Sequence, residues 1–173
     1  IDMIDKYINE YFPDINSITK ILEIGFLAGH SSDYFLSLNG SLKVTSIDIG
    51  SFQSVDCGKE YIDLYYPNRH ILIKADSKKK LLEMDKSIKY DIIFIDGSYE
   101  YEDVKKDLIN CKLYSHKNTI LILNNSINYK NYIKYWNKGP TKIWNEKKNE
   151  NFITELEQID IKVGKGTSIG KYN

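Results

Sequence analysis

Short apolar runs alternate with segments of helical spacing along this chain of 173 residues. Runs of this length, bounded by turn residues, predict buried β-strands. The run YDIIFID at residues 90–96 is apolar on both faces, which is typical of a central strand in a parallel sheet. The predicted strands are residues 20–25, 42–48, 70–75, 90–96 and 118–123.

Between and beyond these runs, apolar residues recur three and four positions apart, which is the spacing of one helix face. An N-terminal helix is predicted to end before Pro13, and Ser31 or Ser32 is expected to cap the next helix. The tail, residues 159–173, has two short strand-like segments around a glycine turn and predicts a hairpin. Further helices are predicted at residues 55–66, around 81–84, and at 101–111, 127–137 and 142–158, the last two separated by Gly139 and Pro140.

Strands that alternate with helices predict an α/β fold with a doubly wound, mostly parallel sheet, to which the C-terminal antiparallel hairpin is added. Right-handed crossovers bring the carboxyl ends of the parallel strands to one edge, and ligands are expected at that edge. No linker or repeat interrupts the pattern, so residues 1–173 are expected to form a single domain.

Charge and composition exclude several classes of protein. The chain carries 24 basic and 24 acidic residues, so it lacks the basic excess of nucleic-acid-binding domains, and no nucleic-acid partner is expected. No stretch approaches the roughly 18 apolar residues of a membrane span, and no signal-peptide pattern opens the chain. The two cysteines are too few for a disulfide framework, which favours a cytoplasmic location.

The segment after the first predicted strand, residues 23–32 (EIGFLAGHSS), has the features of a ligand-binding loop. Gly25 permits a sharp turn off the strand, and Gly29 permits a close approach of the backbone to a ligand. The GxxxG spacing differs from the GxGxxG of dinucleotide-binding folds and disfavours a pyrophosphate site. An ordinary glycine-bearing loop between a strand and a helix is the alternative.

Acidic residues end the second and third predicted strands. Asp48 follows Gly25 by 23 residues and is placed to accept hydrogen bonds from ribose hydroxyls, unless it is only a solvated strand end. Asp76 has two equally weighted interpretations: it accepts a hydrogen bond from an adenine amino group, or it caps the following helix.

The ordered set of these features resembles the class I S-adenosylmethionine (SAM)-dependent methyltransferases, with their Rossmann-like fold. It is most similar to a small O-methyltransferase-like group whose fourth strand ends in Asp-Gly-Asp-His-x-Tyr, followed by a helix with Val…Asp-Leu. The resemblance covers roughly residues 15–173, including the terminal GKGTSIGKYN. The matching residues here are Asp96-Gly97-Ser98-Tyr99-Glu100-Tyr101, then Val104 and Asp107-Leu108.

This resemblance implies SAM as the cofactor. It places the methionine end at the first glycine loop, the ribose at Asp48, the adenine at Asp76 and Ser77, and Asp96 beside the methyl group and the acceptor. The residues expected to bind the cofactor are Glu23, Gly25, Phe26, Gly29, Ser31, Asp48, Ile49, Asp76, Ser77 and Asp96.

The chain departs from the family where the acceptor is expected. The family histidine is Tyr99, and a tyrosine is a poor base at neutral pH. Asp96, Tyr99 and Tyr101 are therefore the candidate catalytic residues, if a base is used at all. Relatives often carry an acid at the end of the fifth strand, where this chain has Asn124 and Asn125. Asp96 with two amides makes only a weak Mg²⁺ site, so we expect no divalent metal.

These observations predict SAM-dependent methylation of an oxygen atom on a small molecule, and the resemblance favours a sugar or glycan precursor. A catalytically inactive methyltransferase-fold domain that binds or organises a partner is the alternative. The aromatic cluster formed by Tyr129, Tyr132, Tyr135 and Trp136 either forms a wall of the acceptor site or packs against the sheet or another subunit. The acceptor site is expected to be open, or to be completed by a second copy of the chain or a neighbouring domain.

Overall fold

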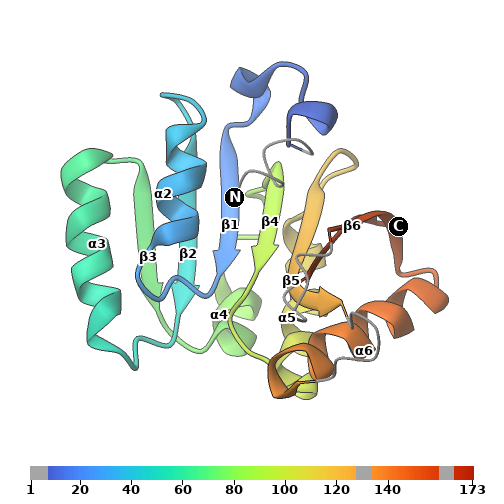
Figure 1. Ribbon diagram of the computed structural model, residues 1–173. Coiled ribbons are helices and arrows are strands. Elements are labelled where there is room, and N and C mark those ends of the chain that lie inside the picture. Colours follow the sequence, from blue (N-terminus) through green and yellow to red (C-terminus); the bar gives the residue numbers. More distant parts are fainter. Residues whose placement is uncertain (1–7, 128–133, 160–165) are drawn as a thin grey trace.

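The computed structural model describes residues 8–127, 134–159 and 166–173 (Figure 1). Residues 8–11 are helical and are followed by the 3₁₀ turn η1. The predicted N-terminal helix otherwise lies outside the described residues. The elements are η1 (Ile15–Ser17), β1 (Lys20–Ile24), α2 (His30–Ser37), β2 (Lys43–Asp48), α3 (Gln53–Tyr65), β3 (His70–Lys74), α4 (Ser77–Glu83), β4 (Ile92–Ile95), α5 (Tyr101–Cys111), η2 (Lys112–Tyr114), β5 (Ile120–Ile127), α6 (Tyr135–Asn149), β6 (Ile153–Ile159) and β7 (Gly166–Tyr172).

The strands form one seven-stranded sheet in the order β3-β2-β1-β4-β5-β7-β6. The strands β1 to β5 pair in parallel, whereas β7 is antiparallel to both β5 and β6. This arrangement confirms the predicted doubly wound sheet with a C-terminal antiparallel hairpin. The predicted central strand is β4, which lies between β1 and β5.

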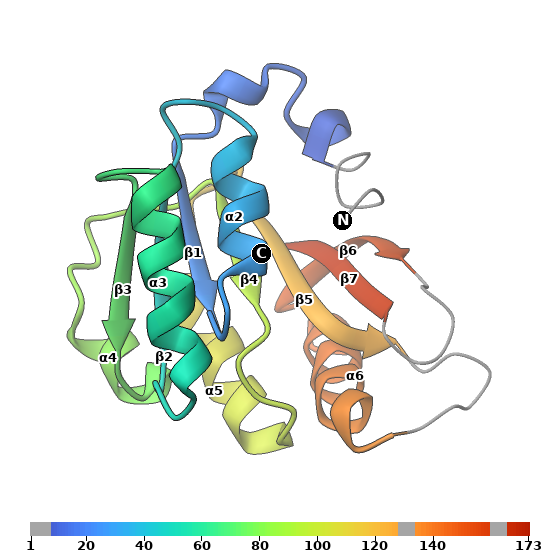
Figure 2. The same cartoon turned by 60° about the vertical axis from the view of Figure 1, so that its left-hand side comes forward.

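Helices cover both faces of the sheet, with α2 and α3 on one side and α4, α5 and α6 on the other (Figure 2). Alternate residues of each buried strand point to opposite faces. Ile21 and Phe94 pack with Phe35 on the α2 side, while Leu22 and Ile93 belong to the cluster on the other side. The strands are apolar on both faces because both faces are covered.

The order of the strands reverses between β1 and β4, where the chain first winds towards β3 and then towards β5. In open α/β sheets such a switch point leaves a crevice at the carboxyl ends of the strands. The loops after β1 and β4 meet there, because a Cβ atom on Gly25 would lie only 2.4 Å from the carbonyl oxygen of Asp96. Gly25 also has a φ of +92°, which residues with a side chain rarely adopt. Both the backbone conformation and the lack of space therefore require glycine at this position.

Two predictions for the C-terminal third are wrong. Gly139 and Pro140 do not separate two helices, because α6 runs continuously through both of them. Gly139 lets α6 approach the β4–α5 loop, since a Cβ atom there would lie 2.2 Å from the carbonyl oxygen of Tyr99. Burial of Pro140, Ile143 and Trp144 offsets the hydrogen bond that the proline cannot make. The predicted helix at 142–158 ends at Asn149, and the chain then forms β6.

Two other boundaries also differ from the prediction. The fifth strand continues past residue 123 to Ile127, and α6 begins at Tyr135. Residues 128–133 of the predicted helix at 127–137 lie outside the described part. Neither Ser31 nor Ser32 caps α2. Its N-cap is Gly29, which makes no side-chain capping bond, and the two serine hydroxyls contact Glu23 instead.

Candidate functional site

The loop between β1 and α2, which contains Gly25 and Gly29 and is called the glycine loop below, is anchored by a buried carboxylate. Glu23 on β1 is fully buried and accepts hydrogen bonds from the hydroxyls of Ser31, Ser32 and Ser46. Burial raises the pKa of Glu23, although the three serine hydroxyls lower it. In this geometry Glu23 and Ser31 position the loop and the start of α2 rather than facing a ligand directly.

The polar network continues from Ser46 to His70. The hydroxyl of Ser46 lies 2.9 Å from Nε2 of His70. Burial, together with the nearby charge of Lys59, lowers the pKa of His70 to about 4, so the imidazole is neutral at physiological pH. The ring of Phe26 stacks on this imidazole at a centroid distance of 4.8 Å. The side chain of Phe26 is therefore buried behind the loop, and its role in binding the cofactor stays a prediction.

Asp48, at the end of β2, is hydrogen-bonded to the backbone of the glycine loop. One carboxylate oxygen accepts hydrogen bonds from the backbone N–H groups of Phe26 (2.8 Å) and Leu27 (2.9 Å). The other oxygen accepts from the N–H of Gly50 at 2.7 Å. The carboxylate is thus held in place at the switch point, where the sequence placed a ribose-binding acid.

A small cavity of about 80 Å³ lies beside Asp48. The predicted cofactor-binding residues Gly25, Asp48, Ile49 and Ser77 line it, together with Gly97 from the loop after β4. Pockets for drug-sized ligands span roughly 300–1,000 Å³, so a nucleoside needs this cavity to widen on binding.

Asp76 does not line this cavity. It is the N-cap of α4, where its side chain accepts a hydrogen bond from the backbone N–H of Lys78 at 3.0 Å. The capping interpretation of Asp76 is therefore confirmed. The acids that line the cavity are Asp48, Asp103 and Asp107. Of these, Asp107 on α5 is only 2% exposed and accepts a hydrogen bond from the hydroxyl of Ser77 at 2.7 Å. Sequence reasoning quoted Asp107 as part of the resemblance but assigned it no role.

Asp96 lies at the end of β4, and its carboxylate accepts two side-chain hydrogen bonds. Nδ2 of Asn124 donates to one oxygen at 3.0 Å, and Nδ2 of Asn125 donates to the other at 3.2 Å. The hydroxyl of Thr167 on β7 donates to Oδ1 of Asn124 at 2.9 Å, which turns the amide nitrogen of Asn124 towards Asp96. Burial raises the pKa of Asp96 to about 6, although the two amides lower it.

A second cavity, of about 400 Å³, opens at Asp96. Its walls are Asn124, Asn125 and the aromatic residues Tyr99, Tyr135 and Trp136. The rings of Tyr99 and Tyr135 meet edge to face at a centroid distance of 6.0 Å. Burial raises the pKa of Tyr99, as do Asp96 and Tyr135, so its hydroxyl stays protonated at neutral pH and is not available as a base.

The third candidate catalytic residue, Tyr101, lies outside this cavity. Its hydroxyl donates to Glu146 on α6, and the ammonium group of Lys142 lies 4.4 Å from its ring centroid. Tyr101 therefore joins α5 to α6 and does not reach the acceptor side. Tyr129 and Tyr132 of the predicted aromatic cluster lie outside the described residues.

Asp96, Asn124 and Asn125 lie together, as a Mg²⁺ site formed by these residues would require, but their arrangement differs from that of a metal site. The amides direct their N–H groups, and not their oxygens, at the carboxylate. In the described part of the chain, no three His, Cys, Asp or Glu residues are grouped in a way that could hold a metal ion. The described helices also include none long and apolar enough to cross a bilayer.

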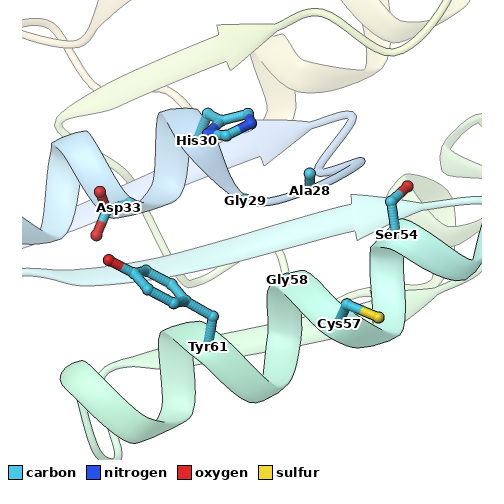
Figure 3. A pocket seen from close by; sticks show the side chains of 8 residues that line it. All are labelled: Ala28, Gly29, His30, Asp33, Ser54, Cys57, Gly58 and Tyr61. Carbon is cyan, nitrogen blue, oxygen red and sulfur yellow. The ribbon is translucent and has the colours of Figure 1, made fainter.

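A third hollow, of about 370 Å³, lies between α2 and α3 and away from these acids (Figure 3). His30 and Asp33 contribute from α2, and Cys57 and Tyr61 contribute from α3. Gly29, which was predicted to bind the cofactor, lines this hollow. A Cβ atom on Gly29 would lie 2.8 Å from the ring of Phe26. Gly29 therefore serves the packing of the loop.

The sequence of residues 22–126, more than half of the chain, matches a family described as a methyltransferase domain. The chain belongs to this family, which confirms the predicted class of SAM-dependent methyltransferase. A search of curated proteins finds no match.

Solved structures with the same fold include several O-methyltransferases. A Staphylococcus aureus protein provisionally assigned as a caffeoyl-CoA O-methyltransferase superposes with a TM-score of 0.79 at 19% identity, over 99% of this chain and 82% of that one. A Bacillus cereus O-methyltransferase in complex with SAH (S-adenosylhomocysteine) gives 0.74 at 18% identity, over 97% and 80%. A SAH-bound methyltransferase of Podospora anserina gives 0.75 at 15% identity, over 94% and 76%.

Proposed function

We propose that this chain transfers a methyl group from SAM to a hydroxyl group of a small molecule. The main support for the proposal is that two cavities are lined by two consecutive residues of the chain. Gly97 lines the cavity beside Asp48, and Asp96 lines the aromatic cavity. A methyl donor on one side and an acceptor on the other would therefore meet at the end of β4, as in-line transfer requires.

The cofactor half is formed by the residues around the smaller cavity. Asp48 offers a carboxylate to the ribose hydroxyls, and Ile49 is exposed and available to cover a base. Carboxylate, hydroxyl and backbone donors at a switch point suit a nucleoside ligand. SAM supplies an electrophilic methyl group on a sulfonium centre when it is bound there. The SAH-bound relatives with the same fold support this choice of cofactor.

Asp96 is the proposed general base. Its pKa of about 6 leaves it ionised at neutral pH, yet closer to neutrality than an ordinary aspartate. The acceptor hydroxyl transfers its proton to Asp96 while its oxygen forms the new bond to the methyl carbon, and the carbon–sulfur bond breaks to release SAH. Asn124 and Asn125 hold the carboxylate in a fixed orientation during this step.

The acceptor is proposed to be a compact ring-bearing molecule, with a sugar or glycan precursor preferred. Tyr99, Tyr135 and Trp136 offer aromatic faces that bury apolar surface of a ring, while Asp96 and the two asparagines offer polar contacts. The preference for a sugar rests on the family resemblance. The single-domain organisation, a cytoplasmic location and a contribution from a second copy of the chain stay predictions.

The test is a screen for SAH formation. The chain is incubated with SAM and a panel of hydroxylated sugars and phenols, with Mg²⁺ in one arm and a chelator in the other. We expect chelator-insensitive turnover with at least one acceptor, and loss of about a hundredfold or more in the isosteric Asp96→Asn variant. Turnover that survives unchanged in Asp96→Asn would refute the assigned base. A chain that binds SAH but methylates nothing would favour the inactive binding domain.

A further inference from the structure

A cavity of about 410 Å³ lies at the amino ends of the parallel strands, opposite the edge that carries the proposed active site. Asp91, which precedes β4, lines this cavity, whereas Asp96, which follows β4, lines the aromatic cavity. The two cavities are therefore separated by the length of a strand, roughly 16 Å. In Figure 1 the segment 8–17 (dark blue) lies at this end of the sheet, beyond the start of β1. The methyl transfer proposed above does not use this cavity.

The acid of this cavity is already held by the protein. One carboxylate oxygen of Asp91 accepts hydrogen bonds from the backbone N–H groups of Thr19 at 2.8 Å and Lys20 at 3.0 Å, and the hydroxyl of Thr19 donates to it at 3.1 Å. The other oxygen lies 3.1 Å from Nε2 of His116. Nδ1 of His116 in turn accepts a hydrogen bond from the backbone N–H of Asn118 at 3.1 Å. Asp91 and His116 therefore join the starts of β1, β4 and β5, which is a structural role.

The cation of this cavity is not held in this way. Lys171, near the end of β7, is partly buried and lines the cavity. Among the described residues, none forms an ion pair or a hydrogen bond with its ammonium group. Ser17 and Asn118 line the cavity too, and their side chains make no hydrogen bond to any described residue. A partly dehydrated ammonium group without a partner favours the entry of an anion.

An aromatic wall, formed by Tyr11 and Phe12, lies beside these polar groups. Both residues are partly buried and pack against the core cluster on the α2 side of the sheet. Aromatic faces of this kind bury the apolar surface of a flat ring. The volume lies within the roughly 300–1,000 Å³ of small-molecule sites, which combine an apolar lining with a few polar groups. The cavity thus offers one positive charge, two neutral polar side chains and an apolar wall to the same ligand.

We propose that this cavity binds a small aromatic carboxylate, with the carboxylate at Lys171 and the ring against the aromatic wall. Lysine presents a compact single charge, which one carboxylate balances. A phosphate dianion fits less well, because the carboxylate of Asp91 lines the same cavity and repels the second charge. The hydroxyl of Ser17 and the amide of Asn118 supply further hydrogen-bond donors. This inference is independent of the proposed methyl transfer.

The test is a protein-observed NMR titration with three probes of similar size. Benzoate carries one negative charge, phenyl phosphate is close to a dianion, and benzyl alcohol is neutral. We expect the wild-type chain to bind benzoate with a Kd of about 1 mM or tighter, and at least about tenfold more tightly than either of the other probes. Shifts of the backbone N–H signals of Ser17, Asn118 and Lys171 should locate the probe, and SAH should not displace it.

Lys171→Met removes the charge and keeps an unbranched apolar side chain. It should weaken the binding of benzoate by about tenfold or more and leave that of benzyl alcohol within about twofold. Lys43→Met is the matched control, because Lys43 is exposed at the start of β2 and does not line the cavity. This control should keep the wild-type affinity for benzoate. Lys171→Gln replaces the methionine variant if the latter does not fold.

Several results would overturn the inference. These are equal binding of benzoate and either other probe by the wild type, unchanged affinity in Lys171→Met, and no saturation by benzoate up to about 10 mM. Shifts confined to the residues around Asp96 would place benzoate in the aromatic cavity and would overturn it as well. Failure of the chain to bind SAH would refute the cofactor site without affecting this inference.

Discussion

Replacing Asp96 by asparagine should remove activity and also remove a pH-dependent loss of stability. The folded pKa of about 6 lies above the ordinary value of 3.8, so the folded state holds this proton more tightly than the unfolded state. Stability therefore falls as the pH rises from about 3.8 to about 6. At about 1.36 kcal/mol per pKa unit, ionisation of Asp96 lowers the free energy of unfolding by about 3 kcal/mol once the pH is above about 6. About half of this loss is already present near pH 5.

The Asp96→Asn side chain has nearly the same shape but carries no charge. We expect its stability relative to the wild type to improve by about 1–1.5 kcal/mol between roughly pH 5 and pH 8. Urea unfolding, followed by circular dichroism at both pH values, measures this difference. Titration of His70 cancels in this comparison because both chains contain it. A Glu60→Gln variant on the exposed surface of α3 controls for charge removal and should stay within about 0.5 kcal/mol of the wild type. A stability difference that is the same at both pH values would refute the raised pKa.

Three further changes test the packing around the site. Gly25→Ala should cost about 3 kcal/mol or more, because its Cβ atom would lie 2.4 Å from the carbonyl oxygen of Asp96, and thermal melting measures this loss. His70→Gln should weaken the dependence of the free energy of unfolding on pH in the acidic range. The folded pKa of His70, about 4, lies below 6.5, so its contribution of up to about 3 kcal/mol is full above pH 6.5 and is lost as the pH falls towards 4. Trp144→Phe should cost about 2–3 kcal/mol in urea unfolding, since a fully buried ring shrinks and Glu155 loses a donor at 2.6 Å.

The parallel half of the fold was predictable because its signals are local. The strands β1 to β5 are short apolar runs, and their carboxyl ends carry Asp48, Asp96, Asn124 and Asn125. Once the sheet is parallel, crossover handedness alone places these residues along one edge. The structure accordingly brings Asp96 and the two asparagines into contact, as the strand ends indicated.

The C-terminal third was harder to predict because its pattern is shaped by tertiary contacts. Ile153, Leu156 and Ile159 recur every third residue, which imitates a helix. They lie on a strand whose register shifts between Glu155 and Glu157, and this bulge places Ile153 and Ile159 in the clusters on opposite faces of the sheet. No local signal marks such a shift.

Side-chain partners within the site were also beyond the sequence pattern. Glu23 is part of a recognisable motif, but only the fold shows that the hydroxyl groups of three serines donate hydrogen bonds to its carboxylate. The presence of Asp107, and not of Asp76, in the lining of the cavity beside Asp48 has the same origin. The capping preference of Asp76 is local, whereas the contact between Asp107 and Ser77 spans 30 residues.

The most direct test of the account is whether the cofactor edge binds SAH. Calorimetric titration of the wild-type chain beside Asp48→Ala measures it without knowledge of the acceptor. The account predicts micromolar binding by the wild type and at least about tenfold weaker binding by the variant, because the carboxylate that meets the ribose is removed. A wild-type chain that circular dichroism shows to be folded, and that binds no SAH, would contradict the proposed site.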